Sequence, residues 1–349
     1  MMAKIIRIGF LGLGVVGARL LTILQENRQM LLQEYDVEII PEAILVRDTT
    51  KARAADITGL RLTTDENELI DNEQISILVE CMGGAGAERT RDILLRALGK
   101  GKHLILSSKK CLAANLAELT EAAKRYGCQL RYDATVGGGI PICSSLRSMA
   151  KGEEITGIYG ILNSTTNYIL SSVSDKGIPY AQAVEDAKQK GYTENDPSED
   201  VDGWDAAYKL VILMNLGMKL SCTMEKIKPE PMKEMLPESN GLQGRDEAVL
   251  KQIACARKNQ DGSVSYYVGP SLVRADQLLA RVGGNNNMIF VESRESGIRA
   301  FYGQGSGAGP TASIMFDDLL DVLKNPREPE KSVLCDRVHR IKAGAHLLF

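Results

Sequence analysis

The sequence predicts an α/β protein in which a doubly wound parallel sheet is followed by a second, α+β domain. Two observations carry this prediction. Near the N-terminus, short apolar segments alternate with helical segments, as in parallel strands joined by helical crossovers. After Gly139 the pattern changes to segments typical of antiparallel strands with helices between them. We therefore expect a first domain at 1–136, to which 308–349 returns, and a second domain at 137–307.

The expected strands of the first domain begin with 5–11, a nearly continuous apolar run of the kind found in strands buried on both faces. They are predicted at 5–11, 43–46, 75–80, 103–107 and 128–134. Helices are predicted at 15–33, from Gly83-Gly84 to about Leu98, and at 112–126, before a glycine suited to a C-cap. In the second domain we expect strands at 155–162 and 287–303, a loop-dominated segment at 222–245, and a helix at 310–323 that returns to the first domain.

Composition excludes several classes of function. The 349 residues carry a net charge of −3 without a long basic run, which argues against nucleic acid and against a membrane surface as partners. The seven cysteines are scattered and form no Cys-x-x-Cys, which favours inert thiols in a reducing cytoplasm over a disulfide framework or a zinc site. The short apolar N-terminus is broken by glycines, so we expect a strand there and no signal peptide; no apolar run is long enough to span a membrane.

A glycine-rich motif, Gly12-x-Gly14-x-x-Gly17, lies between the first strand and a helix that begins with Val15 and Val16. Gly12 permits a tight turn, Gly14 lacks a Cβ that would block a pyrophosphate, and Gly17 lets helix and strand pack closely. The amide groups and positive dipole at the helix N-terminus then suit phosphate. Because the motif lies at the first strand of an α/β pattern, we predict a Rossmann-type dinucleotide site rather than a purely structural turn.

Two further segments lie where open α/β sheets bind ligands. Lys109 follows the strand at 103–107, so it is predicted to face substrate or cofactor, although a solvated loop lysine is the simpler interpretation. Downstream, the three successive glycines of 137–139 suit either a close approach to a ligand or a hinge between domains, and the two roles are compatible.

An acidic loop at 191–203 runs into a strongly apolar helix. Asp202 is a candidate N-cap of that helix. Asp205 and Lys209 are four residues apart and share one helical face. An exposed salt bridge is the simpler interpretation, but the apolar residues that follow Lys209 indicate a buried helix, and ionisable groups at its entrance favour a functional site.

These segments resemble the homoserine dehydrogenase family over nearly the whole chain. The match comprises the glycine turn, the strand-end lysine and four longer segments. Those segments are 134–141 (ATVGGGIP), 162–170 (LNSTTNYIL), 191–210 and 305–313 (GSGAGPTAS). The resemblance implies NAD(P)-dependent interconversion of L-homoserine and L-aspartate 4-semialdehyde, a step of threonine, methionine and isoleucine biosynthesis. It also implies a homodimer that pairs through the sheet of the second domain.

The resemblance assigns roles to single residues. Lys209 and Lys109 are the implied catalytic lysines, together with Asp205. Substrate is held by Glu194 and Asp205, with support from Asp200 and contact from Lys109. The implied cofactor-binding residues are Gly12, Gly14, Val15, Val16, Gly17, Arg47, Lys109, Thr165, Gly305 and Gly307. Asp133, Val136, Gly138 and Ile140 match a family site for Na⁺ or K⁺, built largely from backbone carbonyls. The chemistry is consistent, because hydride transfer belongs to the cofactor and a lysine can take the hydroxyl proton.

Several positions depart from the family pattern and bear on the substrate. Ser164 replaces a usual glycine, Ser108 a usual asparagine, and Asp133 a common glutamate. They leave two alternatives open, a related dehydrogenase acting on another amino acid or semialdehyde, and a non-catalytic cofactor-binding homologue. The chain ends soon after the helix at 310–323, so we expect the short family form without a C-terminal regulatory domain and without threonine feedback.

Cofactor choice is predicted from the end of the second strand, where the adenosine ribose of such folds lies. Arg47 is the first polar residue after that strand, and its guanidinium suits a 2′-phosphate. Lys51 and Arg53 add positive charge, whereas Asp48 would favour NAD if it faced the ribose. We expect NADP to be preferred over NAD.

Overall fold

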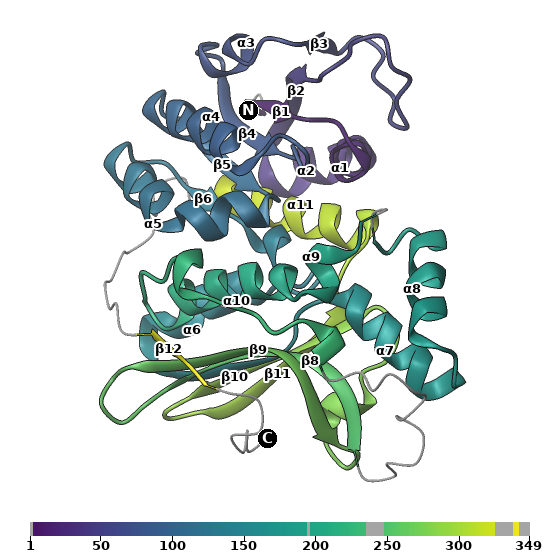
Figure 1. Ribbon diagram of the computed structural model, residues 1–349. Helices are drawn as coiled ribbons and strands as arrows, with labels where there is room; N and C mark the ends of the chain where they lie inside the picture. Colours follow the sequence, from purple (N-terminus) through teal and green to yellow (C-terminus); the bar gives the residue numbers. More distant parts are fainter. Residues whose placement is uncertain (1–2, 194–195, 235–247, 325–337, 342–349) are drawn as a thin grey trace. The chain divides into compact units, whose positions relative to one another are not determined.

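The structure is a computed structural model that describes residues 3–193, 196–234, 248–324 and 338–341. The chain forms two compact units. The first comprises Met1–Gly139 and Gly307–Ser332, and the second comprises Ile140–Ser306 and Val333–Phe349. Each unit is built around its own six-stranded sheet (Figure 1).

The first sheet is parallel throughout, with strand order β3-β2-β1-β4-β5-β6. Its strands are β1 (Lys4–Leu11), β2 (Val37–Leu45), β3 (Arg61–Thr63), β4 (Ile75–Glu80), β5 (His103–Leu106) and β6 (Leu130–Arg131). The order reverses between β1 and β4, which is the topological switch point where such sheets bind dinucleotides. The predicted doubly wound fold is confirmed.

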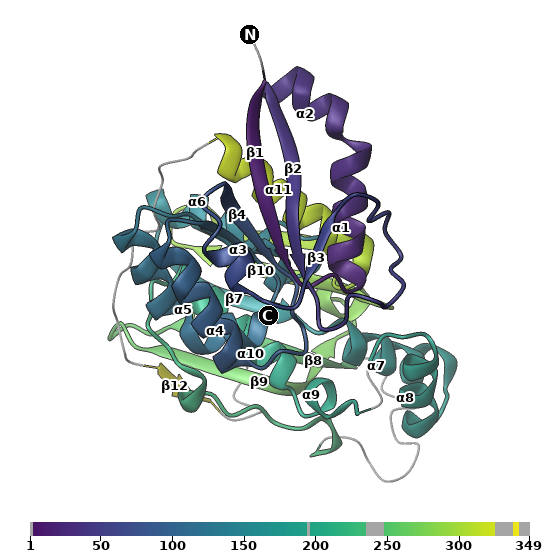
Figure 2. The same ribbon diagram turned by 90° about the horizontal axis from the view of Figure 1, so that it is seen from above.

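Helices cover both faces of this sheet. They are α1 (Val15–Glu26), α2 (Arg28–Tyr35), α3 (Asn67–Ile70), α4 (Ala87–Gly99), α5 (Lys109–Arg125) and α11 (Ala308–Lys324). On one face α1 packs against α11, and Phe10 and Ile77 contribute to the core beneath them. Figure 2 shows α4 and α5 on the opposite face, where they pack against each other.

The carboxyl ends of the strands are aligned in one row. Leu11 at the end of β1 pairs with Leu45 of β2 and with Glu80 of β4. Glu80 in turn pairs with Leu106, the last residue of β5. The turns that follow these strands therefore lie along one edge of the sheet, and they hold the glycine turn, Arg47, Gly83-Gly84 and the segment before Lys109.

The second sheet has the order β11-β10-β7-β8-β9-β12 and is antiparallel except for the β9–β12 pair. Its strands are β7 (Ile155–Ile161), β8 (Ala248–Lys258), β9 (Val264–Arg274), β10 (Asn286–Ser293), β11 (Gly297–Gln304) and β12 (Val338–Arg340). The helices of this unit are α6 (Ile142–Gly152), α7 (Ser164–Lys176), α8 (Tyr180–Gln189), α9 (Ser198–Val201) and α10 (Trp204–Gly217). Both α7 and α10 pack against the sheet, so this one sheet supports both helices.

Four expectations about local structure need correction. The helix predicted at 15–33 is interrupted at Asn27, whose side-chain amide donates to the Ile23 carbonyl oxygen at 2.8 Å and so competes with the helical bond. The strand predicted at 128–134 is only two residues long and leads into a short 3₁₀ turn, η1 (Asp133–Thr135). Residues 338–340 pair with β9 of the second sheet, although the boundaries taken from the sequence placed 308–349 with the first unit. Asp202 does not cap α10, because Gly203, with a φ of 86°, precedes its first turn.

The segment predicted to be loop-dominated, 222–245, is described as far as residue 234 and contains two short 3₁₀ turns, η2 (Met224–Lys226) and η3 (Met232–Glu234). Residues 235–245 lie outside the described part of the chain. Among the described residues, none of the helices combines the length and apolar character needed to cross a bilayer.

Candidate active site

The glycine turn of the first unit has the geometry that phosphate binding requires. Gly12 has a φ of 99°, and a Cβ there would lie 2.6 Å from the Cys81 carbonyl oxygen, so only glycine fits. A Cβ on Gly17 would lie 2.9 Å from the Gly12 carbonyl oxygen, so this glycine serves close packing of α1 against the turn. Gly14 differs from both, because a Cβ there would meet nothing within 4 Å. Its side faces open space at the start of α1.

That space is a cavity of about 1170 Å³ in the first unit. Its wall includes Gly12, Gly14, Val15, Arg47 and the Met82-Gly83-Gly84 turn. Val16 and Gly17 lie behind this wall, in the first turn of α1. The amides of a first helical turn have no acceptor within their own helix, so α1 presents hydrogen-bond donors and its positive dipole end to the cavity. A dinucleotide fits this arrangement of open space, glycine backbone and helix terminus.

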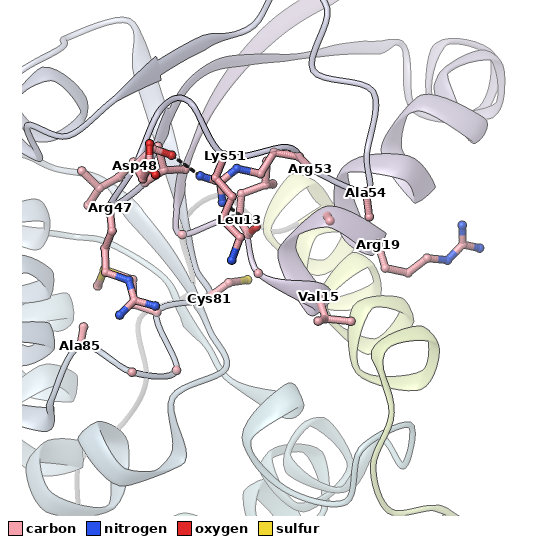
Figure 3. A pocket seen from close by; sticks show the side chains of 18 of the residues that line it. Leu13, Val15, Arg19, Arg47, Asp48, Lys51, Arg53, Ala54, Cys81 and Ala85 are labelled. Carbon is pink, nitrogen blue, oxygen red and sulfur yellow. Dashed lines mark hydrogen bonds between the residues drawn. The ribbon is translucent and has the colours of Figure 1, made fainter. Parts of the chain in front are cut away.

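The turn after β2 separates Arg47 from Asp48. In Figure 3 the Arg47 side chain extends toward the side of the cavity formed by Cys81 and Ala85, whereas Asp48 lies beside Lys51. The Asp48 carboxylate accepts hydrogen bonds from the Thr50 hydroxyl at 2.7 Å and the Thr50 amide at 2.8 Å. These bonds hold the pKa of the Asp48 carboxyl below its usual range. Asp48 is therefore an anion whose carboxylate already accepts hydrogen bonds from its own turn.

Arg53 ties the same turn to the glycine turn. Its guanidinium donates to the Asp48 carbonyl oxygen and, at 3.5 Å, to the Leu13 carbonyl oxygen. Among the described residues, Arg47 makes no hydrogen bond or ion pair, and its side chain is exposed. The two arginines thus have different places, with Arg53 supporting the cavity wall and Arg47 available to a ligand.

In the second unit, a buried network of polar side chains joins α7, α9 and α10. The ammonium of Lys209 donates to the Asp205 carboxylate at 2.7 Å and to the Leu162 carbonyl oxygen at 2.8 Å. Lys209 is 7% exposed and Asp205 is 2% exposed. The sequence pattern also allowed an exposed surface salt bridge, and this degree of burial rules that interpretation out.

Asn163 connects this pair to a second carboxylate. Its side-chain amide donates to Asp205 at 2.7 Å and to Asp200 at 2.6 Å, while its side-chain oxygen accepts from the Thr166 amide at the start of α7. Asp200 also accepts from the Thr193 hydroxyl at 2.8 Å. Asn163 was not among the predicted site residues. Its position at the end of a strand and directly before a helix was the available signal, because asparagine is a preferred N-cap.

The Leu162 carbonyl oxygen also accepts a hydrogen bond from Asn287, whose side-chain amide donates to it at 3.1 Å. A Cβ on Gly305 would lie 2.2 Å from the Asn287 side chain, so Gly305 makes room for this contact. Thr165 donates to the Tyr192 carbonyl oxygen at 2.7 Å, and Ser164 donates to Ser306 at 2.8 Å. Ser164 therefore links the start of α7 to the segment that contains Gly305.

A buried lysine supports the segment that carries Asn287. Lys251, on β8, is 2% exposed, donates to the Val282 carbonyl oxygen at 2.6 Å and contacts the Asn167 side-chain oxygen at 3.0 Å. Asn167 in turn donates to the carbonyl oxygens of Gly284 and Asn286. Burial lowers the pKa of Lys251 to about 8. Unlike Lys209, whose ammonium pairs with the Asp205 carboxylate, Lys251 donates to a backbone carbonyl oxygen and to the Asn167 side-chain oxygen.

The remaining predicted residues are distributed as follows. Lys109 opens α5 at the ligand-binding edge of the first sheet. Glu194 lies outside the described residues. Asp133 and Val136 are buried in and beside η1, and Gly138 has a φ of 59°; these residues belong to the first unit, whereas Ile140 begins the second. Gly307 likewise belongs to the first unit and Gly305 to the second.

The cysteines are poor nucleophiles, as the sequence predicted. The six in the described part of the chain form no disulfide, and burial raises the pKa of Cys111 and Cys255 to about 12 and that of Cys128 to about 11. Those groups are therefore neutral thiols at physiological pH.

Comparison with known proteins identifies the family. The model of the homoserine dehydrogenase family matches residues 141–320, and the model of its NAD-binding domain matches residues 12–133. The chain belongs to the homoserine dehydrogenase family. Members of this family are oxidoreductases, and the NAD-binding domain coincides with the sheet and glycine turn described above.

Individual relatives agree with this assignment. Homoserine dehydrogenase of Bacillus subtilis is 34% identical over 93% of this chain and 74% of its own length. The Synechocystis enzyme is 37% identical over 91% of this chain and 73% of its own length. Among solved structures, a Thiobacillus denitrificans homoserine dehydrogenase superposes with a TM-score of 0.87 at 31% identity, covering 95% of this chain and 80% of the other. A hyperthermophilic archaeal homoserine dehydrogenase in complex with NADPH gives a TM-score of 0.76 at 26% identity, covering 94% and 100%.

The open space beside Gly14 leads to a prediction about Gly14→Ala. The new methyl group meets no protein atom, so the free energy of unfolding should change by no more than about 0.5 kcal/mol, the usual range for surface substitutions. Because the methyl group enters the cavity, the dissociation constant for reduced nicotinamide cofactor, measured by its fluorescence, should rise by about 10-fold or more.

Gly152→Ala is the matched control, since its Cβ also meets nothing within 4 Å but lies in the other unit. It should leave cofactor binding unchanged. Wild-type affinity in Gly14→Ala would mean that the cofactor phosphates do not lie over this turn.

Proposed function

We propose that this chain interconverts L-homoserine and L-aspartate 4-semialdehyde with a nicotinamide cofactor and prefers NADP. The observation that carries the proposal is the buried pair of Asp205 and Lys209, joined by Asn163 to Asp200. The family assignment supports the reaction. The archaeal relative solved with NADPH supports the phosphorylated cofactor.

The chemistry assigned to Lys209 follows from its partners. The cofactor, when bound, accepts hydride from the carbon that bears the hydroxyl group. The protein must then remove the hydroxyl proton, and in the reverse direction it must protonate the carbonyl oxygen. An ammonium held by a carboxylate is a positioned donor to the carbonyl oxygen, and its positive charge stabilises an alkoxide in the same place. In the oxidation direction the same side chain must start as the neutral amine, which takes the hydroxyl proton and becomes the ammonium. We therefore assign Lys209 as the main acid/base group, with Asp205 orienting it.

The other roles are proposed on the same basis. Asp200, Asp205 and Glu194 would hold the substrate amino and hydroxyl groups, and Lys109 would contact substrate and cofactor. Carboxylates suit an ammonium ligand, and the network places two of them on one asparagine. On the cofactor side, we propose the cavity residues Gly12, Gly14, Val15 and Arg47 with Val16 and Gly17 behind them, and Thr165, Gly305 and Gly307 near the nicotinamide.

We extend the proposal to assembly and ions. The first unit would bind the cofactor, and the second would bind substrate and form a homodimer in the cytoplasm. Asp133, Val136, Gly138 and Ile140 would hold Na⁺ or K⁺. The fit of such an ion is supported by the buried Asp133 carboxyl and by the φ values of Gly137 (79°) and Gly138 (59°), which turn the backbone sharply there.

Two alternatives remain distinguishable. The bond between Ser164 and Ser306 places a hydroxyl where the family pattern has none, which would suit a dehydrogenase acting on a different amino acid or semialdehyde. A non-catalytic homologue would bind cofactor without turnover. Rates with L-homoserine and with other hydroxy amino acids separate these alternatives from the proposed reaction.

NADP preference is supported by the turn after β2. A 2′-phosphate needs a cation, and Arg47 is exposed on the cavity wall without a protein partner among the described residues. NAD selection would need a carboxylate for the ribose hydroxyls, and the candidate, Asp48, is engaged by Thr50.

The proposed reaction predicts the behaviour of Lys209→Ala. Wild type should reduce NADP with L-homoserine at alkaline pH, followed by absorbance, and the variant should lose about 100-fold or more in kcat, the usual scale of general acid–base catalysis. Cofactor binding should survive. A variant that retains more than about a tenth of wild-type kcat would transfer the acid/base role to Lys109.

Removing Lys209 also takes away an ammonium that pairs with the buried Asp205, and breaking a buried pair in this way costs about 3–5 kcal/mol. The double variant Asp205→Asn/Lys209→Met removes both charges and serves as the control for folding. It should recover stability but not activity. Recovery of turnover in the double variant would show that the single variant failed only because it unfolded.

Arg47→Ala should discriminate between the two cofactors. Loss of hydrogen bonds to a charged phosphate should weaken NADP binding by about 1.5–3 kcal/mol. NAD binding should be nearly unchanged, and Arg19→Ala, a second arginine on the cavity wall, is the control. Equal loss for both cofactors would mean that Arg47 contacts the adenine, and a wild-type preference for NAD would mean that Asp48 holds the ribose.

A further inference from the structure

Glu80, the last residue of β4, is a buried carboxylate to which the mechanism above gives no part. It is 0% exposed and ends a strand whose other residues, apart from Ser76, are apolar. Among the described residues, it forms no ion pair with lysine or arginine. Burying such a charge is costly unless hydrogen bonds replace the lost water.

Hydrogen bonds do replace it, and they come from two different turns. One carboxylate oxygen accepts from the Met82 amide at 2.6 Å and from the Ser108 hydroxyl at 2.6 Å. The other accepts from the Ser108 amide at 2.9 Å and from the Ser107 amide at 3.2 Å. All four donors lie in the first unit, and three of them are backbone amides, whose positions are fixed by the path of the chain.

These two turns lead to the two parts of the proposed site in this unit. Met82 begins the Met82-Gly83-Gly84 turn, which lines the cofactor cavity. Ser108 directly precedes Lys109, the first residue of α5, and Ser108 makes no capping bond of its own to that helix. The Glu80 carboxylate accepts from Ser107 and Ser108, directly before α5, and a negative charge at a helix N-terminus is favoured by the helix dipole.

We propose that Glu80 is a positioning residue that fixes Lys109 and the Met82–Gly84 cavity wall relative to each other. The inference rests on the proposed role of Lys109 in the reaction. Glu80 pairs with Leu106 of β5 in the sheet, so the two turns leave neighbouring strands at the same level. One carboxylate bridges them, so neither turn can move relative to the other without the loss of a hydrogen bond to Glu80.

The geometry also explains what Ser108 does. Its hydroxyl is the one side-chain donor to the carboxylate from the described part of the chain, whereas the neighbouring Ser107 hydroxyl donates to the Glu80 backbone carbonyl oxygen at 2.9 Å. The two serine hydroxyls thus contact different parts of Glu80, the Ser108 hydroxyl its carboxylate and the Ser107 hydroxyl its backbone. Ser107→Ala is therefore a matched control for Ser108→Ala.

Glu80→Gln keeps the size of the side chain but turns one acceptor oxygen into an NH₂ group that faces N–H donors. We expect kcat with L-homoserine to fall by about 10- to 100-fold, the scale of a misplaced reacting group, and the dissociation constant for NADPH to rise by about 5-fold or more. Ser108→Ala should change both quantities in the same direction, with a fall in kcat of about 3- to 10-fold. Ser107→Ala should lower kcat by less than about 2-fold. Thermal unfolding of each variant identifies any that has lost its fold. If Glu80→Gln does not fold, Ser108→Ala, which removes only one donor, tests the inference in its place.

A double-mutant cycle tests whether Glu80 acts through Lys109. In a Lys109→Ala background, Glu80→Gln should lower kcat by less than about 3-fold. An equal loss in both backgrounds, or wild-type kcat and NADPH affinity in Glu80→Gln, would overturn the inference. If instead Lys109→Ala keeps wild-type kcat, the proposed role of Lys109 in the reaction is wrong. The inference that Glu80 acts through Lys109 is then also wrong, whatever the effect of Glu80→Gln.

Discussion

The second unit depends on the interaction between Asp205 and Lys209, an ion pair almost completely removed from water. Such a pair is a poor source of stability, because desolvation offsets much of the attraction. It persists here because neighbouring groups complete its hydrogen bonds. Asn163 donates to the carboxylate, and the Leu162 carbonyl oxygen accepts from the ammonium. The surrounding fold is arranged to hold these two polar partners, which are adjacent in sequence at the junction of β7 and α7.

The first unit meets a different constraint, the need to place backbone donors around an anion. Gly12, whose φ is 99°, turns the chain at the end of β1 so that α1 begins at the edge of the sheet. The register of the sheet brings the ends of β2 and β4 to the same level. Glu80 extends this arrangement to the next strand, because its single buried carboxylate accepts hydrogen bonds from the backbone amides of the turns after β4 and β5. The two units therefore place their polar groups in different ways. The second unit uses side chains in its core, and the first unit uses backbone groups at the carboxyl edge of its sheet.

Much of this could be predicted from the sequence. Apolar runs and glycine spacing are local signals, and they gave the parallel sheet and the turn at Gly12. The four-residue spacing of Asp205 and Lys209 predicted that they share a face, and the apolar residues after them predicted burial. The role of Asn163 could not be derived in this way, because its partners Asp200 and Asp205 are 37 and 42 residues away. Glu80 was missed because it ends an apolar strand and looks like a solvated residue at its edge.

The local errors have similar causes. Gly203 replaces Asp202 at the start of α10 because the chain arrives there from another short helix, α9, and needs the positive φ that glycine adopts. The break at Asn27 depends on a side chain that bonds to its own helix, which the apolar periodicity does not reveal. The short strand at 338–340 has too few residues for alternation to be recognised, and it is defined by its partner β9.

The central claim is that the reacting oxygen of the substrate lies against the buried pair of Asp205 and Lys209. A crystal structure with L-homoserine and the reduced cofactor tests it most directly, because these two molecules cannot react with each other. The account predicts the homoserine hydroxyl within hydrogen-bonding distance of the Lys209 amino group, about 2.7–3.2 Å, with the cofactor in the cavity beside Gly14. A homoserine hydroxyl bound away from Lys209 would contradict it.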